Sequence, residues 1–525
     1  MLRALPRLRA ARAHTGMSGV RAQSTHANVL DELEARGFVH ATTSPELRKQ
    51  LESPTTAYAG IDPSAPSLHV GNLLPLMGLL HLRAHGHRPL ALIGGATGMI
   101  GDPSGRSTER NALSEADLAT NVVGITGQVH AFFARGAAYA TKRGYAAGDA
   151  SGGDGAVRVL NNYEWFRGLG FLEFLRDVGK FARVNTMLAR ESVRSRMDAE
   201  AGISFTEFSY QLLQAHDFAT LYREHDCRLQ LGGSDQWGNI VAGIDMIHRV
   251  RGQAAAEAAQ AAGAGEGEGE GEGEGKREGK GGGQEQGSGG ARGAERAAGA
   301  VEAARAEAPP AFGLTIPLLT TASGDKFGKS AGNAVWLDPA RTSVNDFYQF
   351  FYRAPDADVE KYLSLLTLVG RERIATVMDA HARAPRERRA QALLADEVTE
   401  LVHGPEGVAK AHAAQAILYA RDARALKSAD VLAALEGDPR LVRLSLSEIR
   451  GVPIAKLVAV HGLVASRSEA TRLIKPKNSA IHVNDVPVTD PRQEIVLSNL
   501  VDKHLAVVRR GTRDMLVFYI THDGQ

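Results

Sequence analysis

The sequence predicts an α/β protein: a doubly wound parallel-sheet (Rossmann-like) domain, followed by an α-helical domain and a small α+β domain. Three observations lead to this prediction. In the first 340 residues, short apolar runs alternate with helical segments, and several runs end in glycine clusters. After residue 341 the apolar residues recur with helical spacing alone. Near residue 446, short helices are followed by a predicted hairpin. Strands that alternate with helices are typical of a parallel sheet.

Length and composition limit the classes of protein to consider. A chain of 525 residues is long enough for several domains. Hydrophobic residues make up 43% of it, which is enough for sizeable cores. The net charge of +1 gives no general attraction to nucleic acid, so an RNA surface would be a local patch. The single cysteine, Cys227, excludes a disulfide framework and a multi-cysteine zinc site.

The first 27 residues have the composition of a mitochondrial transit peptide. The segment contains five arginines and no acidic residue, with leucines among the arginines and serine and threonine after most of them. No apolar core of secretory length is present in this segment. We therefore expect import into the mitochondrial matrix and removal of residues 1–27. A disordered basic tail is the alternative.

A strand, a turn and a helix follow one another between residues 58 and 82. The strand ends at Ile61, Asp62 and Pro63 break it, and the apolar run Leu73–Leu82 predicts a helix. The segment from His69 to Asn72 then lies at the N-terminus of that helix. Free N–H groups and the helix dipole favour phosphate at such a position.

The next apolar runs continue the same pattern. Leu90–Ile93 predicts a second strand that ends in a glycine-rich segment containing Asp102, and Val157–Leu160 predicts a third strand. Ligands in doubly wound sheets lie beyond the carboxyl ends of the strands, which is where these glycines fall. Ordinary turn formation is the alternative for the glycines. Gly136–Gly155, rich in glycine and alanine, predicts an exposed connection.

A helix over Phe208–His225 carries three polar residues at i, i+4 and i+7, namely Tyr210, Gln214 and Asp217. This spacing places them together on one face. A solvated polar face is the usual explanation, but strand segments flank this helix, so a pocket wall is as plausible. A short strand at Leu229–Leu231 then leads into a Gly-Gly-Ser-Asp-Gln segment and a further helix.

The Rossmann-like domain is expected over residues 28–340, with a disordered insertion at 253–310. Gly265–Gly275 alternates glycine and glutamate, a composition that cannot bury enough apolar surface to fold. The strand Phe312–Leu319 resumes the domain and leads into a glycine-flanked loop, Lys326–Ser330.

Residues 341–440 are expected to form the helical domain, and residues 446–525 a small RNA-binding domain. Two helices, Ile454–Val460 and Ser466–Ile474, precede a hairpin over Ile481–Val488. Basic residues cluster at the second helix and just after it; they are Arg467, Arg472, Lys475 and Lys477. A solvated face is the usual explanation for such a cluster, but in a small terminal domain it also suits phosphate binding.

His69-Val-Gly-Asn72 and Lys326-Phe-Gly-Lys-Ser330 together resemble the two ATP signatures of class I aminoacyl-tRNA synthetases. The surrounding residues, from Val29 to Phe518 without the insertion, resemble tyrosyl-tRNA synthetases of the bacterial and organellar type. The resemblance implies activation of tyrosine with ATP and its transfer to tRNA(Tyr). It also implies that the helical domain faces the anticodon.

The resemblance further implies roles for individual residues. The tyrosine-binding positions are Tyr58, Asp102, Tyr210, Gln214, Asp217 and Gln236. Among them, Tyr58 and Asp217 would bond the phenolic hydroxyl. The ATP-binding positions are Gly60, Asp62, Ser64, His69, Gly71, Asn72, Gly233, Asp235, Lys326 and Lys329. The catalytic positions are His69, Asn72, Arg106, Arg110, Lys326 and Lys329. Magnesium would accompany ATP, with no metal held by the protein, and a homodimer would form with Phe205 at its interface.

The departures from the family pattern are modest. Asn72 replaces the more common histidine, Arg106 stands where lysine is frequent, and Ser64 where threonine is frequent. Three alternatives stay open. A tryptophanyl-tRNA synthetase would share the architecture, and a small-molecule nucleotidylyltransferase could share the first signature. An RNA-binding protein with a role in intron splicing belongs to a non-enzyme class, and such a role could also accompany catalysis.

Overall fold

The computed structural model describes residues 28–104, 113–145, 157–198, 202–265, 310–320, 329–330, 333–420, 422–475, 479–511 and 514–521. The predicted transit peptide, residues 1–27, lies outside this part of the chain, as do residues 266–309 of the predicted insertion. Lys326, Arg106 and Arg110 also lie outside it. Within the described ranges, no helix is both long enough and apolar enough to cross a membrane.

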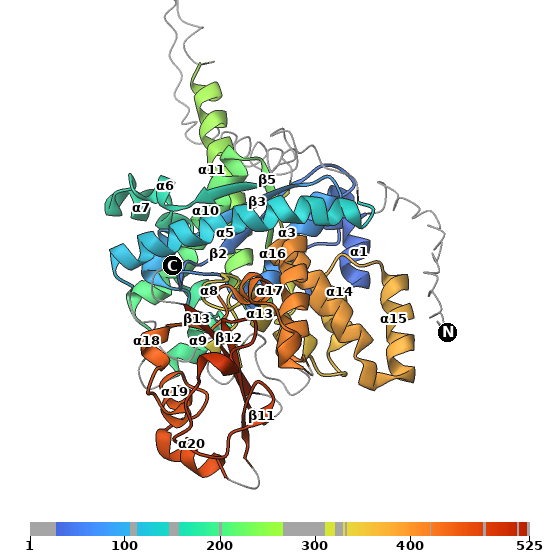
Figure 1. The fold of residues 1–525 in the computed structure, drawn as a ribbon. Helices are drawn as coiled ribbons and strands as arrows, with labels where there is room; N and C mark the ends of the chain where they lie inside the picture. The colour runs from blue at the N-terminus through green and yellow to red at the C-terminus, as the bar shows by residue number, and fades with distance from the viewer. Residues whose placement is uncertain are drawn as a thin grey trace, which may run out of the picture.

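A six-stranded sheet is the centre of the first part of the fold, and its strands β2, β3 and β5 are labelled in Figure 1. The strand order is β1-β6-β5-β2-β3-β4. Its strands are β1 (Ala41–Thr42), β2 (Thr56–Ile61), β3 (Arg88–Ile93), β4 (Arg158–Asn161), β5 (Cys227–Gly233) and β6 (Phe312–Ile316). All neighbours are parallel except β1, which pairs antiparallel with β6. The chain runs outward from β2 through β3 to β4 and then returns to build β5 and β6 on the other side. The predicted doubly wound sheet is thus confirmed, and its direction reverses between β2 and β5, where such folds bind ligands.

Helices cover both faces of this sheet. They include α1 (Val29–Ala35), α3 (Leu73–Ala84), α5 (Glu115–Lys142), α10 (Phe205–Glu224) and α11 (Trp237–Gly265). Ala57, Ala59 and Ile61 of β2 belong to the core that contains residues of α1, α3 and α5. Tyr58 belongs to a separate core with residues of α10 and α11. Since successive strand residues point to opposite faces, a strand apolar at nearly every position is buried on both sides.

The prediction of an exposed connection over Gly136–Gly155 is wrong in its first part. Residues 136–142 are the last two turns of α5, where Gly136, Tyr139 and Ala140 are buried. A Cβ atom at Gly136 would lie 3.0 Å from the Cδ1 atom of Leu80 on α3. The small residues therefore allow close helix packing, and alanine also favours the helix.

The predicted disordered insertion begins too early. The helix α11 continues past residue 253 as far as Gly265. The residues from 254 to 262 are mostly alanine, which has the highest helix propensity of all residues. Figure 1 shows this end of α11 standing away from the body of the protein.

The region after residue 341 is helical, as predicted. Its main helices are α13 (Val344–Tyr352), α14 (Val359–Leu366), α15 (Arg371–Arg383), α16 (Arg389–Leu418) and α17 (Ser428–Leu435). Residues of α13, α14 and α16 share one core with α1, α3 and α5. Buried ion pairs join the same parts, since Arg143 lies 2.5 Å from Glu397 and 2.8 Å from Glu400 of α16. The helical region is thus fastened to the sheet region by both apolar and charged contacts.

A second sheet, of order β11-β10-β12-β13-β9, forms the C-terminal part. Its strands are β9 (Leu441–Ser445), β10 (Ile481–Val483), β11 (Val486–Pro487), β12 (Leu505–Arg510) and β13 (Asp514–Thr521). The predicted hairpin is present, and Asn484 and Asp485 at its turn have φ of 48° and 65°. The edge strand β9 precedes residue 446, where the domain was expected to begin. Two helices, α19 (Ile454–Val460) and α20 (Arg467–Leu473), pack on one face, and α16 and α17 contribute to the core on the other.

Candidate active site

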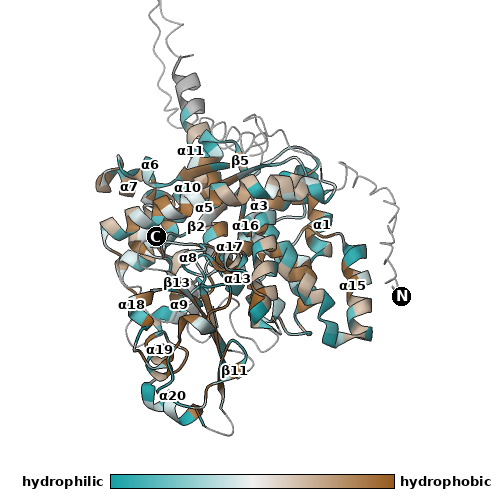
Figure 2. Cartoon of the chain, viewed as in Figure 1, coloured by the Kyte–Doolittle hydropathy of each residue, from teal (hydrophilic) through white to brown (hydrophobic). Residues whose placement is uncertain are grey.

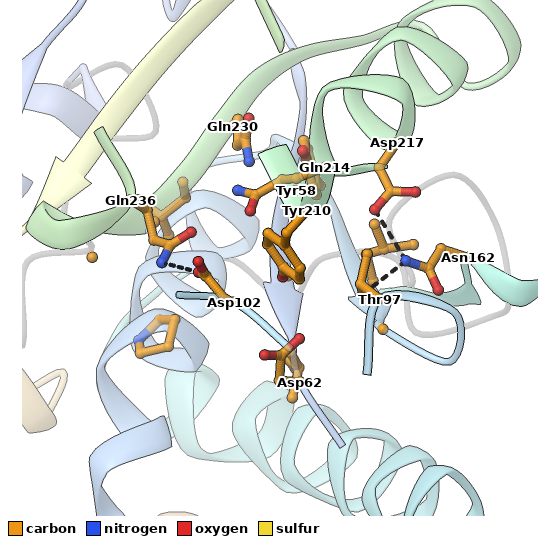
Figure 3. A pocket seen from close by; sticks show the side chains of 18 residues that line it. Tyr58, Asp62, Thr97, Asp102, Asn162, Tyr210, Gln214, Asp217, Gln230 and Gln236 are labelled. Carbon is orange, nitrogen blue, oxygen red and sulfur yellow. Dashed lines mark hydrogen bonds between the residues drawn. The ribbon is translucent and has the colours of Figure 1, made fainter. Parts of the chain in front are cut away.

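A cavity of about 210 Å³ opens at the carboxyl ends of β2, β3 and β5, beside α10 (Figure 3). Its polar lining comes from five separate parts of the chain; the side chains are Tyr58, Asp62, Thr97, Asp102, Asn162, Tyr210, Gln214, Asp217, Gln230 and Gln236. Backbone at Gly60, Gly94, Gly232 and Gly233 completes it. The cavity therefore lies where the direction of the sheet reverses, the position favoured for ligands in this class of fold.

Asp217 is the buried carboxylate at one end of the cavity. The Trp165 indole N–H donates to its Oδ1 at 2.8 Å, and Asn162 Nδ2 donates to its Oδ2 at 3.0 Å. Burial raises the pKa of Asp217 to about 7, although the hydrogen bonds from Asn162 and Trp165 act in the opposite direction. A carboxylate oxygen can accept more than one hydrogen bond. Asp217 can therefore still accept a hydrogen bond from a ligand.

Asn162 fixes the position of Asp217 from a loop after β4. Its Oδ1 accepts the Ala96 backbone N–H at 2.7 Å, and its Nδ2 also approaches Thr97 Oγ1 at 3.0 Å. Figure 3 shows the Asn162 amide between Thr97 and Asp217. Because both polar atoms of this amide have protein partners, its orientation is set before any ligand binds.

Tyr58 lies close to Asp217 and is 1% exposed. Its ring packs against Phe218, with 5.4 Å between the ring centroids. The Tyr58 hydroxyl is buried and has no hydrogen-bond partner in the described part of the chain. Burial and then the charge of Asp217 raise its pKa well above the ordinary value. Buried hydroxyls nearly always have a partner in folded proteins, and because Tyr58 lines the cavity its hydroxyl is available to hydrogen-bond a ligand there.

The opposite end of the cavity holds a chain of amides and a carboxylate. Gln236 Nε2 donates to Asp102 Oδ2 at 2.6 Å, and Asn239 Nδ2 donates to Gln214 Oε1 at 3.0 Å and to Gln236 Oε1 at 3.2 Å. Burial raises the pKa of Tyr210 well above its usual value, and the negative charges of Asp62, Asp102 and Asp217 raise it further. The same negative field favours a bound cation such as an ammonium group.

A tight turn holds the His69 segment at the N-terminus of α3. The Gly71 N–H donates to His69 Nδ1 at 3.0 Å, and the His69 N–H donates to Asn72 Oδ1 at 3.0 Å. Asn72 thus caps the short 3₁₀ turn Val70–Asn72 with its oxygen. Its amide NH₂ is not used in this cap and has the chemistry to donate to a phosphate oxygen.

The predicted site residues fall into three groups. Nine of them line the cavity: Tyr58, Gly60, Asp62, Asp102, Tyr210, Gln214, Asp217, Gly233 and Gln236. His69, Gly71 and Asn72 form the turn before α3. Ser64 and Asp235 are not part of the lining; the Ser64 N–H donates to the Asp62 carbonyl at 2.9 Å, and Asp235 directly precedes Gln236. Arg106, Arg110, Lys326 and Lys477 lie outside the described residues, and Lys329 is described only as the start of a two-residue strand, β7 (Lys329–Ser330).

The predicted basic residues are on α20 and just after it, and Figure 2 shows α20 partly in teal, the hydrophilic colour. Arg467, Arg472 and Lys475 are exposed there. Arg509, another arginine of this small domain, has a different role. Its guanidinium donates to the carbonyl oxygens of Leu418 and Ala420 at 2.9 and 3.0 Å, joining β12 to the end of α16.

Comparison with known proteins identifies the family. The model for "tRNA synthetases class I (W and Y)" matches residues 49–262 and 294–420. The tyrosine–tRNA ligase of Roseiflexus castenholzii is 39% identical over 488 residues, which is 92% of this chain and 97% of that protein. The ligase of Anaeromyxobacter dehalogenans is 38% identical, with coverage of 93% and 98%. The chain belongs to the class I tyrosyl-tRNA synthetases.

Two solved tyrosyl-tRNA synthetases have a similar fold. The C-terminally truncated mitochondrial enzyme of Aspergillus nidulans is 31% identical, with a TM-score of 0.57, and the match covers 73% of this chain and 92% of that one. The corresponding protein of Coccidioides posadasii is 32% identical, with a TM-score of 0.56 and coverage of 73% and 90%.

Some polar residues of this tyrosyl-tRNA synthetase are not predicted from the sequence. Asn162, Trp165 and Asn239 hold the predicted residues in place, and Gln230 lines the cavity from β5. Asn162 directly follows β4, and a polar residue just beyond the end of a strand is a feature of the sequence that could have predicted a site residue. Gln230 is a polar residue between two buried leucines of a central strand, which is also detectable in the sequence.

Proposed function

We propose that this tyrosyl-tRNA synthetase joins tyrosine to ATP, giving tyrosyl-adenylate and pyrophosphate, and then transfers tyrosine to tRNA(Tyr). The observation that carries the proposal is the polarity of the cavity. One end has a buried carboxylate and an unpaired hydroxyl, and the other has amides in a field of negative charge. A tyrosine molecule has a hydroxyl at one end and an ammonium group at the other.

The orientation of tyrosine follows from these two ends. The phenolic hydroxyl would donate to Asp217 and accept from Tyr58, which satisfies the unpaired hydroxyl of Tyr58. The ammonium group would lie near Asp102, Tyr210 and Gln214. The carboxylate would then point toward the glycine backbone at the strand ends. At Gly60 an added Cβ atom would meet no atom within 4 Å, so there is open space for a ligand beside this backbone.

Both steps require that the substrates be held in position and that the developing negative charge on phosphate be stabilised. Neither step requires a nucleophile from the protein. A tyrosine carboxylate oxygen forms a bond to the α-phosphorus of ATP, and the bond to pyrophosphate breaks. A ribose hydroxyl at the 3′ end of tRNA then attacks the tyrosyl carbonyl, and AMP leaves. Stabilising the developing phosphate charge is the main requirement. His69 and Asn72 at the start of α3 suit that task, with Arg106, Arg110, Lys326 and Lys329 as the cations. Magnesium would enter with ATP.

The wider surfaces suit tRNA binding and dimerisation. The exposed basic residues of α20 would contact tRNA phosphates. Large apolar side chains are exposed between residues 171 and 205, including Phe171 at 67%, Leu172 at 78% and Phe205 at 70%. Apolar exposure of this extent marks an association surface. We propose that a second copy of the chain covers it, giving a homodimer.

Two features support a mitochondrial location. Residues 1–27 are rich in arginine and contain no acidic residue. The two similar solved structures are of mitochondrial enzymes. Expression of the full chain with a C-terminal fluorescent label should give mitochondrial fluorescence, and deletion of residues 1–27 should abolish it. Unchanged localisation of the deletion would argue against the transit peptide.

The activity is tested by tyrosine-dependent exchange between ATP and pyrophosphate, followed by charging of tRNA(Tyr). The purified chain should catalyse exchange only when tyrosine is present. Exchange that depends on tryptophan instead, or no exchange with either amino acid by a folded protein, would contradict the proposal.

A further inference from the structure

The His69 segment is paired with a distant part of the chain. Val70 N–H donates to the Val335 carbonyl at 2.9 Å, and Leu337 N–H donates to the Leu68 carbonyl at 2.8 Å. His69 and Trp336 face each other in this short antiparallel pair. The two hydrogen bonds flank the His69–Trp336 pair rather than joining it. In antiparallel pairs this is the arrangement that brings facing side chains closest together.

The facing side chains are both aromatic and contact each other edge to face. The centroids of the His69 and Trp336 rings are 6.2 Å apart, with 69° between the ring planes. Both values lie in the range that aromatic pairs prefer. His69 Nδ1 also accepts the Gly71 N–H, so the neutral imidazole carries its proton at Nε2. The Gly71 bond and the Trp336 ring together limit the directions in which that Nε2–H can point.

Trp336 is itself held in place. Its backbone N–H donates to Thr342 Oγ1 at 2.9 Å, and the Arg341 guanidinium lies 5.8 Å from the centre of its ring. The two flanking residues, Val335 and Leu337, are buried in the core. The backbone on both sides of the indole is therefore fixed, and the indole is held against the His69 imidazole.

Trp336 lies a few residues after the two lysines that are proposed to bind the phosphates of ATP. The strand β8 (Asn333–Ala334) ends two residues before it. Lys326 and Lys329 precede it by ten and seven residues, since 336 − 326 = 10 and 336 − 329 = 7. The pairing of Trp336 with His69 thus joins β8, and with it Lys329 of the paired strand β7, to the turn at the start of α3.

We propose that Trp336 is a positioning residue for adenylate formation, acting through His69. It orients the His69 imidazole toward the nucleotide and anchors β8, whose partner strand β7 begins at Lys329. This inference rests on the proposed role of His69 in the ATP site. Trp336 need not touch either substrate, since its effect passes through the ring that it supports.

The test is a double-mutant cycle on the rate of tyrosyl-adenylate formation, measured in single turnovers at saturating tyrosine. Trp336→Leu should slow the step about three- to tenfold, the range that corresponds to loss of one aromatic pair. Trp336→Phe keeps an aromatic ring and should restore most of the rate. In a His69→Ala background, Trp336→Leu should cause little further loss, because the ring that it positions is already gone. Equilibrium binding of tyrosine should change little in all variants.

Tyr348→Leu serves as the matched control. Tyr348 also contacts a histidine edge to face, with 5.5 Å between its ring centroid and that of His412. It lies on α13 and does not line the cavity. This variant should leave adenylate formation unchanged, whatever it does to thermal stability.

The outcomes distinguish the inference from the function on which it rests. If His69→Ala leaves the rate unchanged, the proposed role of His69 is wrong. If His69→Ala slows the step but Trp336→Leu has no effect, the inference about Trp336 alone is overturned. Additive losses in the double variant, or equal slowing by Trp336→Phe and Trp336→Leu, would also overturn it.

Discussion

Replacing Tyr58 by phenylalanine should separate the stability of the fold from recognition of the substrate. The Tyr58 hydroxyl is buried with no hydrogen-bond partner among the described residues. Its raised pKa keeps it neutral at physiological pH, so it remains a hydrogen-bond donor. The Tyr58→Phe change removes this hydroxyl and keeps the ring that packs against Phe218. The free enzyme therefore loses a desolvated polar group and no hydrogen bond.

The expected changes in stability and activity have opposite signs. Leaving a buried polar group unpaired costs roughly 1–3 kcal/mol, so the ligand-free variant should be more stable by up to about that amount. A hydrogen bond between neutral groups contributes about 0.5–1.5 kcal/mol, and about 1.4 kcal/mol corresponds to a factor of ten. The kcat/KM for tyrosine should therefore fall roughly two- to twelvefold.

Two assays decide the matter. Thermal unfolding of the ligand-free protein should give an equal or higher midpoint for Tyr58→Phe than for the wild type. Exchange kinetics should show a fall in kcat/KM for tyrosine and no comparable fall for phenylalanine, which has no hydroxyl to accept the bond. A clearly lower unfolding midpoint would show that the hydroxyl has a partner within the protein. Equal losses for both amino acids would show that it does not read the phenol.

Three further predictions concern other parts of the site and the fold. Asp217→Asn should lower kcat/KM for tyrosine by about ten- to a hundredfold, the range for a hydrogen bond to a charged group. Activation of phenylalanine, measured in the same assay, should change little, and a parallel fall would contradict this role. Lys326→Ala should slow adenylate formation far more than it weakens tyrosine binding, because charge develops on pyrophosphate in the transition state; equal effects in pre-steady-state kinetics would refute it. Burial lowers the pKa of His87, His216 and His403 to about 4, from 6.5. Between these values the three histidines bind more protons in the unfolded chain than in the folded one, so their contribution to stability should be complete above pH 6.5 and be lost as pH drops toward 4. Each histidine contributes up to about 1.4 kcal/mol per pH unit. Urea unfolding across this range should show a smaller slope of stability against pH for His216→Phe, and an unchanged slope would contradict the assignment.

Much of the fold could be predicted because its strands are apolar runs bounded by glycine or proline. The helix over Ile454–Val460 has the predicted bounds, and the hairpin around Asn484 is predictable from its turn residues. The errors come from small residues. Gly136 lies in a helix, where its lack of a side chain lets Leu80 of α3 pack closely, a contact that exists only in the folded protein. The alanine-rich part of α11 has no apolar periodicity and so resembles the disordered insertion that follows it, yet alanine alone favours a helix.

In the candidate site, too, residues with a local sequence pattern could be predicted, whereas residues that depend on long-range contacts could not. Helical spacing placed Tyr210, Gln214 and Asp217 on one face of α10, and the structure shows all three lining the cavity. Their supporting residues were not predicted. Asn162 reaches Asp217 from 55 residues away in the sequence, and no local spacing reports such a contact. The unpaired hydroxyl of Tyr58 is likewise a property of packing in three dimensions.

The central claim is that the end of the cavity with Tyr58 and Asp217 reads the phenolic hydroxyl of tyrosine. The most direct test is the ratio of kcat/KM for tyrosine to that for phenylalanine in pyrophosphate exchange by the wild-type protein. A site built to bond a hydroxyl rejects the analogue that lacks it by roughly 10⁴–10⁵, and the upper figure comes from tyrosyl-tRNA synthetase itself rather than from this structure. We predict a ratio of that order. A ratio of about one hundred or less, which an apolar pocket could produce on its own, would contradict the claim.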